Sequence, residues 1–276
     1  MGNNAPIGIY DSGLGGLTVV REVLSLLPGE DIIYFGDTAR TPYGSRPPAE
    51  ILRFMHEILD FFSSQKVKLA ITACNTMTAL GLEQAKKEYP FLIIGVNSGA
   101  AAALAASRNK HIGVVATEAT INSGKHVAAI KALNPAAEVF PQPCPQYVPL
   151  IEQEKLFGPE IEQASREYLT PLNAAGVDAL ILGCTHYPFI SPLIREIMGS
   201  EVALINPARE TAAEARTLLA HQDMLATRAQ GNVRLCFSAD LPRAERFTTC
   251  AIDFGHTRAR APEFELVNLQ DYSVKL

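Results

Sequence analysis

The stretch IGIYDSGLGGLTVVREVLSLLPGEDIIYFG, residues 7–36, contains one full alternation of strand and helix. It begins and ends with unbroken apolar runs, IGIY and IIYFG, which are typical of strands buried on both faces. Between them, apolar residues recur at helical spacing: Leu17, Val20, Leu24 and Leu27. The pattern stops at Pro28–Gly29, a helix-ending pair. This order predicts a helix that connects two parallel strands.

The same alternation continues along the chain. Five more apolar runs of this kind follow: LAITA (69–73), LIIGV (92–96), IGVVA (112–116), ALILG (179–183) and VALI (202–205). A second helical repeat follows Pro47–Pro48, with apolar residues at Ile51, Met55, Ile58 and Phe62. We therefore predict an α/β protein in which helices flank mainly parallel sheets.

Two pairs of similar segments indicate an internal duplication. IGIYDSG at residue 7 and IGVVATEAT at residue 112 begin alike, 105 residues apart. AITACNT (70–76) and LILGCTH (180–186) each run from an expected strand into a cysteine, and these cysteines are 110 residues apart. The similar offsets predict two related α/β units. Since parallel sheets bind ligands beyond the carboxyl ends of their strands, facing units would present Cys74 and Cys184 to one cleft.

Composition excludes several classes of partner. The 276 residues carry a formal net charge of −5, without the basic excess that would bind nucleic acid or an anionic membrane. The longest candidate for a membrane span, GAAAALAA (99–106), is far shorter than the roughly 18 residues required. The N-terminus lacks a secretory signal pattern, so we expect a cytoplasmic protein. Five cysteines do not indicate a disulfide scaffold in a chain of this length.

The two cysteines that follow strands are candidates for chemistry. A single buried cysteine is more often a small core side chain, but these two precede polar residues and an expected helix. A helix N-terminus favours a thiolate or a bound carboxylate. Cys74, Cys184 and His186 could instead bind a metal, although their spacing matches no metal-binding motif. We expect no metal.

Three other segments allow more than one interpretation. YDSGLGGLT (10–18) predicts a tight glycine turn, but it lacks a phosphate-loop motif, and Asp11 would repel a phosphate. GDTARTPYGS (36–45) fits a surface loop or a ligand-binding loop equally well. Glu152, at the end of VPLIE, fits a helix-start or solvated carboxylate better than an acid in a ligand site.

Taken together, the motifs resemble the glutamate racemase family within the aspartate/glutamate racemase superfamily. They occur in family order over residues 7 to about 220: YDSGLGGLT, GDTARTPYG, ACNTMTA, ATEATI, CPQYVPLIE and LILGCTHYP. The resemblance implies two similar α/β domains that face each other across a central cleft. Residues 1–98 plus 207–276 would form the first domain, and residues 99–206 the second.

The resemblance also implies a reaction and a set of site residues. Racemisation needs acid–base groups on both faces of the α-carbon, and Cys74 and Cys184 would supply them. Asp11 would assist Cys74 and His186 would assist Cys184, with Glu152 near the substrate ammonium group. The substrate-binding residues implied are Asp11, Ser12, Pro42, Tyr43, Gly44, Ser45, Asn75, Thr76, Thr120, Thr185 and His186.

The same resemblance implies a small-molecule substrate, glutamate, a role in peptidoglycan synthesis, and a homodimer. No cofactor is expected, because the sequence contains no phosphate-binding loop coupled to a Schiff-base lysine. Two alternatives remain open. An aspartate racemase would act on a substrate one methylene shorter, a difference of about 1–3 kcal/mol in a pocket. A catalytically silent amino-acid sensor would use the same two domains with its cysteines merely packed.

Overall fold

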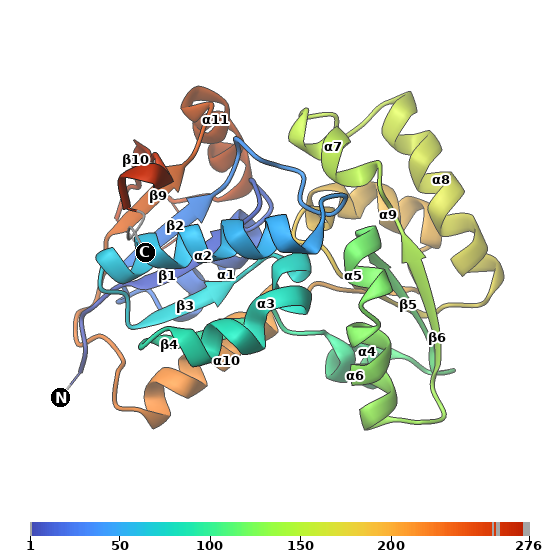
Figure 1. Cartoon of the computed structure of the whole chain (residues 1–276). Coiled ribbons are helices and arrows are strands. Elements are labelled where there is room, and N and C mark those ends of the chain that lie inside the picture. The colour runs from blue at the N-terminus through green and yellow to red at the C-terminus, as the bar shows by residue number, and fades with distance from the viewer. Residues whose placement is uncertain (1, 256, 258–259, 273–276) are drawn as a thin grey trace. The chain divides into compact units, whose positions relative to one another are not determined.

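In the computed structural model, the chain divides into two compact units (Figure 1). Residues 2–255, 257 and 260–272 are described. The first unit is discontinuous in sequence and contains residues 1–96 and 208–276, and the second contains residues 97–207. Among the residues that the structure describes, no helix is long and apolar enough to span a membrane.

The first unit is built on a parallel six-stranded sheet. Its strands, in spatial order, are β10 (Glu263–Leu266), β9 (Val233–Phe237), β2 (Ile32–Gly36), β1 (Ile7–Asp11), β3 (Leu69–Thr72) and β4 (Leu92–Gly95). β1 lies near the centre, with Ile7 paired to Ile32 on one side and to Leu69 on the other. The carboxyl ends of β1, β2 and β3 therefore meet at one edge of the sheet.

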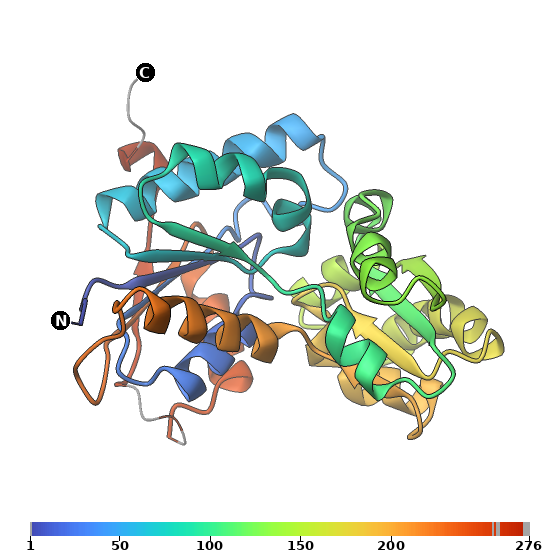
Figure 2. The same ribbon diagram turned by 90° about the horizontal axis from the view of Figure 1, so that it is seen from below.

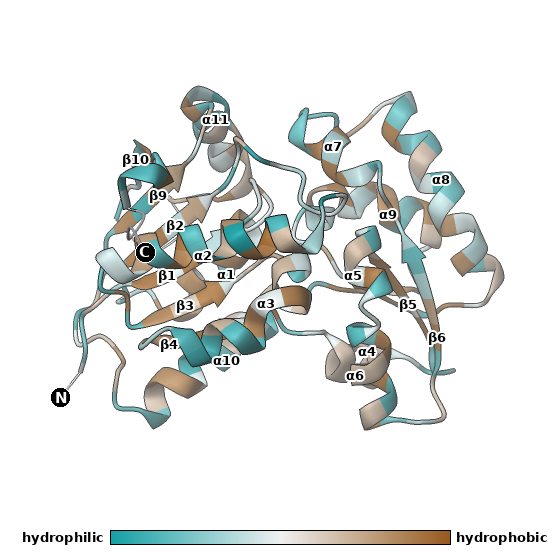
Figure 3. Ribbon diagram, viewed as in Figure 1, coloured by the Kyte–Doolittle hydropathy of each residue, from teal (hydrophilic) through white to brown (hydrophobic). Residues whose placement is uncertain are grey.

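Helices cover both faces of this sheet. Figure 2 shows α2 (Pro48–Ser64) and α3 (Asn75–Glu88) on one face, and α1 (Leu17–Leu26) and α10 (Ala208–His221) on the other. The helix α11 (Leu241–Ala251) contacts α1 and β10, and the 3-10 helix η2 (Leu269–Tyr272) packs on α2. The strands are mostly apolar, whereas the helices have mixed apolar and polar surfaces (Figure 3).

Aromatic packing joins α2 to the sheet. The Phe62 ring meets the Tyr10 ring edge-on at 5.8 Å, and Phe61 packs 5.7 Å from Phe35. A side chain at Gly8 would place its Cβ 2.7 Å from the Phe62 ring, so glycine allows the helix to approach this closely. Such contacts stabilise the unit mainly through buried apolar area, with about 0.5–1.5 kcal/mol more from each favourable ring pair.

The second unit contains a parallel four-stranded sheet. Its spatial order is β6 (Glu138–Pro143), β5 (His111–Ala116), β7 (Ala179–Leu182) and β8 (Ala203–Ile205). The longer helices pack in pairs: α4 (Ala100–Ala106) with α6 (Lys125–Leu133), and α8 (Pro159–Ala174) with α9 (Ser191–Met198). The shorter helical segments are α5 (Glu118–Asn122), α7 (Tyr147–Glu152) and the 3-10 helix η1 (Tyr187–Ile190).

The two sheets share a topology. The order β2-β1-β3-β4 in the first unit matches β6-β5-β7-β8 in the second. The similar segments at residues 7 and 112 form β1 and β5, and those around Cys74 and Cys184 follow β3 and β7. The predicted α/β class, with parallel strands flanked by helices, is confirmed. Three strands were not predicted: β6, β9 and β10.

Candidate active site

Three neighbouring strands of the first unit end in polar or nucleophilic residues. Asp11 is the last residue of β1, Asp37 follows β2, and Cys74 follows β3. The main chain links these ends: the N–H of Asp37 donates to the carbonyl of Asp11 at 3.1 Å, and the N–H of Ala73 donates to the carbonyl of Tyr10 at 2.9 Å. The sheet register therefore brings the predicted Asp11 and Cys74 to adjacent strand ends.

Cys74 is the N-cap of α3. Its backbone is extended, with φ −68° and ψ 119°, and its carbonyl accepts the N–H of Thr78 at 2.9 Å. Asn75 and Thr76 form the start of the helix, and all three side chains are buried. The positive end of a 14-residue helix stabilises nearby negative charge by about 0.3–1 kcal/mol, and more where the site is partly buried. Cys74 therefore lies at the positive end of this helix.

Tyr10 and Cys74 belong to the same buried cluster. The hydroxyl of Thr72 donates to the Tyr10 oxygen at 2.6 Å. Burial raises the pKa of Tyr10 above its usual range, and the nearby Cys74 charge raises it further, although the bond from Thr72 opposes the shift. Tyr10 therefore stays a neutral phenol beside the thiol.

The glycine turn after β1 holds Asp11 in place. The N–H of Gly13 donates to Asp11 Oδ1 at 3.2 Å, and Tyr34 donates its hydroxyl to the Gly13 carbonyl at 2.6 Å. A Cβ at Gly16 would lie 2.6 Å from the Cβ of Asp11 and 2.8 Å from the Tyr34 ring. Only glycine fits there, so the turn packs directly against the carboxylate. Ser12 is also buried in this turn.

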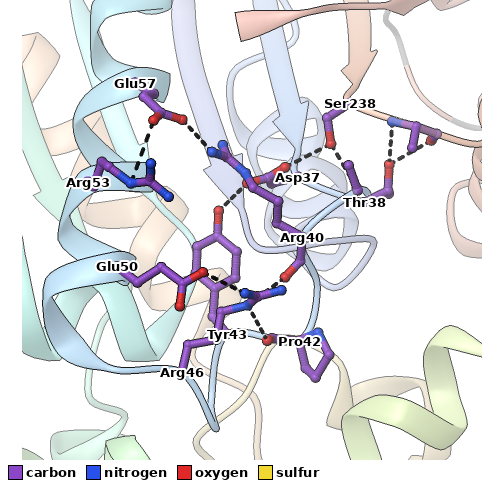
Figure 4. Close-up of polar contacts among 12 residues, drawn as sticks. Asp37, Thr38, Arg40, Pro42, Tyr43, Arg46, Glu50, Arg53, Glu57 and Ser238 are labelled. Carbon is purple, nitrogen blue, oxygen red and sulfur yellow. Dashed lines mark hydrogen bonds and ion pairs between the residues drawn. The ribbon is translucent and has the colours of Figure 1, made fainter. Parts of the chain in front are cut away.

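The loop that contains Pro42, Tyr43, Gly44 and Ser45 is fixed by Asp37. This buried carboxylate accepts hydrogen bonds from the Tyr43 hydroxyl, from Arg40 Nε at 2.6 Å and from Ser238 Oγ at 2.8 Å (Figure 4). Burial, followed by the charge of Asp37, raises the pKa of Tyr43 far above its usual range. The Tyr43 hydroxyl is therefore already bonded to Asp37 inside the protein. The backbone groups of the loop are left as candidates for binding a ligand.

In the second unit, Cys184 begins a chain of three buried groups. Cys184 follows β7 after Gly183, and its Sγ lies 3.7 Å from Nδ1 of His186. The other ring nitrogen of His186, Nε2, lies 2.6 Å from Oε1 of Glu152. All three residues are at most 7% exposed. The imidazole thus connects the thiol to a carboxylate.

Electrostatics favour a protonated His186. Burial is the largest single effect and opposes protonation, but the hydrogen bonds and charges of Cys184 and Glu152 together raise its pKa well above 6.5. With Nε2–H donated to the carboxylate, Nδ1 either accepts the thiol proton or, as imidazolium, donates to a thiolate. The imidazole of His186 can therefore act as either acceptor or donor toward Cys184.

Glu152 is part of this Cys184–His186–Glu152 series of contacts and does not lie at the start of a helix. It is the last residue of α7 and is only 5% exposed, so the interpretation as a helix-start or solvated carboxylate is wrong. A carboxylate at the C-terminal end of a helix meets the negative end of the helix dipole. The protonated ring of His186 compensates for that repulsion.

The remaining predicted residues of this unit lie at the ends of the neighbouring strands β5 and β7. Thr117 caps α5 and accepts the N–H of Thr120 at 3.4 Å, while its hydroxyl lies 3.0 Å from the Thr120 oxygen. Thr120 is 1% exposed, and Thr185 is buried between Cys184 and His186. Within each unit, the predicted side chains thus gather at one edge of the sheet.

The metal-binding alternative requires a cluster of ligand side chains. In the described part of the chain, no group of three or more His, Cys, Asp or Glu side chains is arranged to hold an ion. Of the three ligands considered, Cys74 belongs to the first unit, and Cys184 and His186 belong to the second.

Sequence reasoning missed several residues that hold the loop of residues 42–45: Asp37, Arg40, Arg46 and Ser238. Asp37 carried a usable signal, because it follows an apolar strand directly, as Cys74 nearly does. Ser238 had none, because it reaches Asp37 from 201 positions along the chain.

The fold and these clusters define a class of enzyme with two α/β units, each built on a parallel sheet and each with a buried cysteine after topologically equivalent strands, β3 and β7. Residues 14–215 match the model of the family described as Asp/Glu/Hydantoin racemase. A glutamate racemase from Gloeobacter violaceus is 46% identical over 223 residues, covering 81% of this chain and 84% of that protein. The chain belongs to the Asp/Glu/Hydantoin racemase family.

Solved structures agree with this assignment. A glutamate racemase from Francisella tularensis, crystallised in complex with D-glutamate, matches with a TM-score of 0.84 and 35% identity over 98% of this chain and 99% of that one. A glutamate racemase isoform from Bacillus anthracis matches with a TM-score of 0.86 and 32% identity over 97% and 98% of the two chains.

Proposed function

We propose that this protein interconverts L- and D-glutamate without a cofactor, using Cys74 and Cys184 as the two acid–base groups. One observation carries the proposal: the two cysteines follow topologically equivalent strands, β3 and β7, and each has its own charge-stabilising environment. The printed names of the relatives, including the Francisella protein with bound D-glutamate, support glutamate as the substrate.

The reaction requires one thiolate and one thiol at a time. The thiolate removes the α-proton from one face and becomes a thiol, while the other thiol gives its proton to the opposite face of the carbanion and becomes a thiolate. A free thiol has a pKa of about 8.5, so forming a thiolate at pH 7 costs about 2 kcal/mol. The N-terminus of α3 and the His186–Glu152 pair are devices of the right size to offset that cost.

His186 would act through Cys184 rather than on the substrate carbon. When Cys184 is a thiolate, imidazolium Nδ1–H donates to Sγ, and Glu152 stabilises the ring charge. When Cys184 gains the α-proton, the imidazolium keeps its Nδ1–H, and Sγ remains a weak acceptor for it as a thiol. Asp11, at the end of β1, would assist Cys74 in the first unit.

Glutamate would bind with one thiol on each face of its α-carbon. Hydroxyl, amide and backbone N–H groups would then orient its carboxylates and stabilise the carbanion. The residues proposed for this role are Ser12, Gly44, Ser45, Asn75, Thr76, Thr120 and Thr185, with Pro42 and Tyr43 shaping the loop. An interaction of Glu152 with the substrate ammonium group would compete with its bond to His186.

The test is to incubate the purified protein with L-glutamate, and separately with L-aspartate, without added cofactor and in the presence of a chelator. Circular dichroism of the amino acid should decay to zero for glutamate and much more slowly for aspartate. Faster decay with aspartate would instead identify an aspartate racemase. No decay with either amino acid would favour the silent sensor.

We further propose that the protein supplies D-glutamate for peptidoglycan in the cytoplasm and works as a homodimer. Depletion of the protein should then stop growth unless D-glutamate is supplied. Light scattering of the purified chain, whose monomer mass is 29.8 kDa, should give about twice that mass; the monomer mass would contradict the dimer.

A further inference from the structure

The side chain of Arg46 closes over the loop that precedes it. Arg46 Nε donates to the carbonyls of Arg40 at 2.9 Å and of Pro42 at 3.2 Å, and Nη1 donates to Glu50 on α2 at 2.7 Å (Figure 4). Its backbone N–H also donates to the Tyr43 carbonyl at 3.0 Å. This last bond closes a turn with Gly44 and Ser45 at its centre.

The same loop is held from inside by Asp37. The bonds from Arg40 and Tyr43 to this carboxylate fix the loop at two points, and Ser238 completes the carboxylate's partners. The guanidinium of Arg40 also lies 3.9 Å from the centroid of the Phe54 ring and pairs with Glu57 on α2. The inner contacts are thus set by buried groups, whereas Arg46 holds the outer side from a position 31% exposed.

The side chain of Arg46 reaches three acceptors with two donors, because Nε–H is shared between the carbonyls of Arg40 and Pro42 and Nη1 donates to Glu50; this arrangement suits the geometry of a guanidinium. Its donors form a rigid planar fork, whereas a lysine ammonium is a point charge on a flexible stem. Ordering the backbone of one residue costs about 1–2 kcal/mol, so a loop that must be rigid before it binds a ligand needs such fixed contacts. An exposed salt bridge to Glu50 alone would contribute at most about 1 kcal/mol.

We propose that Arg46 is a positioning residue: it clamps the Tyr43–Arg46 turn so that Gly44 and Ser45 are oriented for the substrate carboxylate. This inference rests on the proposed glutamate racemase function. The clamp acts on binding of both enantiomers rather than on proton transfer. Losing it therefore raises KM in both directions and leaves kcat nearly unchanged.

Arg53, on α2, provides a matched control. The guanidinium of Arg46 lies 5.5 Å from the centroid of the Phe54 ring, and that of Arg53 lies over the same ring at 5.1 Å and faces Glu57 at 4.0 Å. Arg53 is 66% exposed and its ion pair is with its own helix rather than with the loop. Arg53→Gln therefore removes the same charge near the same ring without removing the clamp.

The experiment compares Arg46→Gln, Arg46→Lys and Arg53→Gln with the unmodified protein. Racemisation kinetics are measured from both enantiomers, and hydrogen–deuterium exchange is followed in peptides covering residues 37–47. Arg46→Gln should raise KM about 10-fold or more, the effect of losing one charged hydrogen-bond donor, and should speed exchange in the loop. Arg46→Lys should restore the charge but not the KM, and Arg53→Gln should change neither property.

Each other outcome overturns the proposal in an identifiable way. Unchanged KM and unchanged exchange in Arg46→Gln would show that the loop needs no clamp. A raised KM without faster exchange would make Arg46 a direct substrate contact. If Arg53→Gln changes KM as much as Arg46→Gln does, or if Arg46→Lys has the KM of the unmodified protein, the positive charge alone accounts for the effect and no clamp is needed. If Arg46→Gln fails to fold, Arg46→Lys decides the question by the same two readouts.

The two proposals fail separately. If the unmodified protein does not racemise glutamate, the proposed function is wrong. The exchange rates of the loop still report whether Arg46 orders it, because that measurement requires no substrate.

Discussion

Cys74 and Cys184 occupy equivalent positions in two sheets of the same topology, yet their surroundings differ. Cys74 caps a 14-residue helix and lies beside the end of β1, which contributes Asp11. Cys184 precedes only a four-residue 3-10 helix and is linked instead to His186 and Glu152. The two related sheets place a cysteine after equivalent strands, and in the proposed mechanism each unit would stabilise a thiolate there by different means.

The two means are comparable in size. A helix N-terminus contributes about 0.3–1 kcal/mol, and up to about 2 kcal/mol in a partly buried geometry. A hydrogen bond from a charged donor contributes about 1.5–3 kcal/mol. The upper ends of both ranges reach the roughly 2 kcal/mol that separates a free thiol from its thiolate at pH 7. The proposed mechanism therefore predicts that the two cysteines respond to different mutations.

Removing either thiol should have the largest effect. Cys74→Ala and Cys184→Ala should each lower kcat for racemisation by about 10³-fold or more, because each removes one of two required acid–base groups. Cys250, which is exposed, provides the control, and Cys250→Ala should leave the rate unchanged. Substantial racemisation by either single variant would contradict the proposal that both cysteines are required.

Mutating the assisting groups should separate the two halves. His186→Asn and Asp11→Asn should each lower kcat/KM by about 10²-fold, equally from both enantiomers, because the equilibrium constant between enantiomers is one. With α-deuterated substrates, the isotope effect should increase for one enantiomer in His186→Asn and for the other in Asp11→Asn. An increase for the same enantiomer in both variants would contradict the assignment of one helper to each thiol.

The His186–Glu152 pair should make stability depend on pH. The pKa of His186 is raised on folding, so its protonation stabilises the fold fully below about pH 6.5, and this contribution is lost as pH rises through the folded value. Glu152→Gln should lower the folded pKa, so the contribution should be smaller and its loss should be complete at a lower pH. Urea unfolding at several pH values tests this, and identical pH profiles for the two proteins would contradict it.

The smallest effect concerns one glycine beside each cluster, Gly16 next to Asp11 and Gly183 next to Cys184. Gly16→Ala should destabilise the protein by about 1–3 kcal/mol, because its Cβ would lie 2.6 Å from that of Asp11. Gly183→Ala meets the carbonyl of Val115 at 3.0 Å and should cost less. Thermal unfolding ranks the two, and the reverse order would show that the second cluster is the more tightly packed.

Continuous apolar runs were enough to predict seven of the ten strands in the described part of the chain. The three missed strands lack such a run. β6 contains Pro141 and Pro143, which an edge strand tolerates. β9 is interrupted by Arg234, whose charge is paired with Glu265 on β10. Their places in the sheets depend on tertiary contacts rather than on local pattern.

The candidate site shows the same limit. The duplicated strand–cysteine segments located both thiols, and the family resemblance supplied Asp11 and His186 as their helpers. The bond from His186 to Glu152 joins residues 34 positions apart on different elements, so it cannot be predicted from local spacing. The loop held by Asp37 likewise depends on Ser238, near the end of the chain.

The most direct test of the two-thiol account is racemisation of protiated L-glutamate in deuterated water, followed to low conversion by mass spectrometry of the separated enantiomers. Two thiols on opposite faces predict that the D-glutamate formed carries deuterium at the α-carbon, while the remaining L-glutamate keeps its proton. D-glutamate that retains the original proton would require one group to act on both faces and would contradict the account.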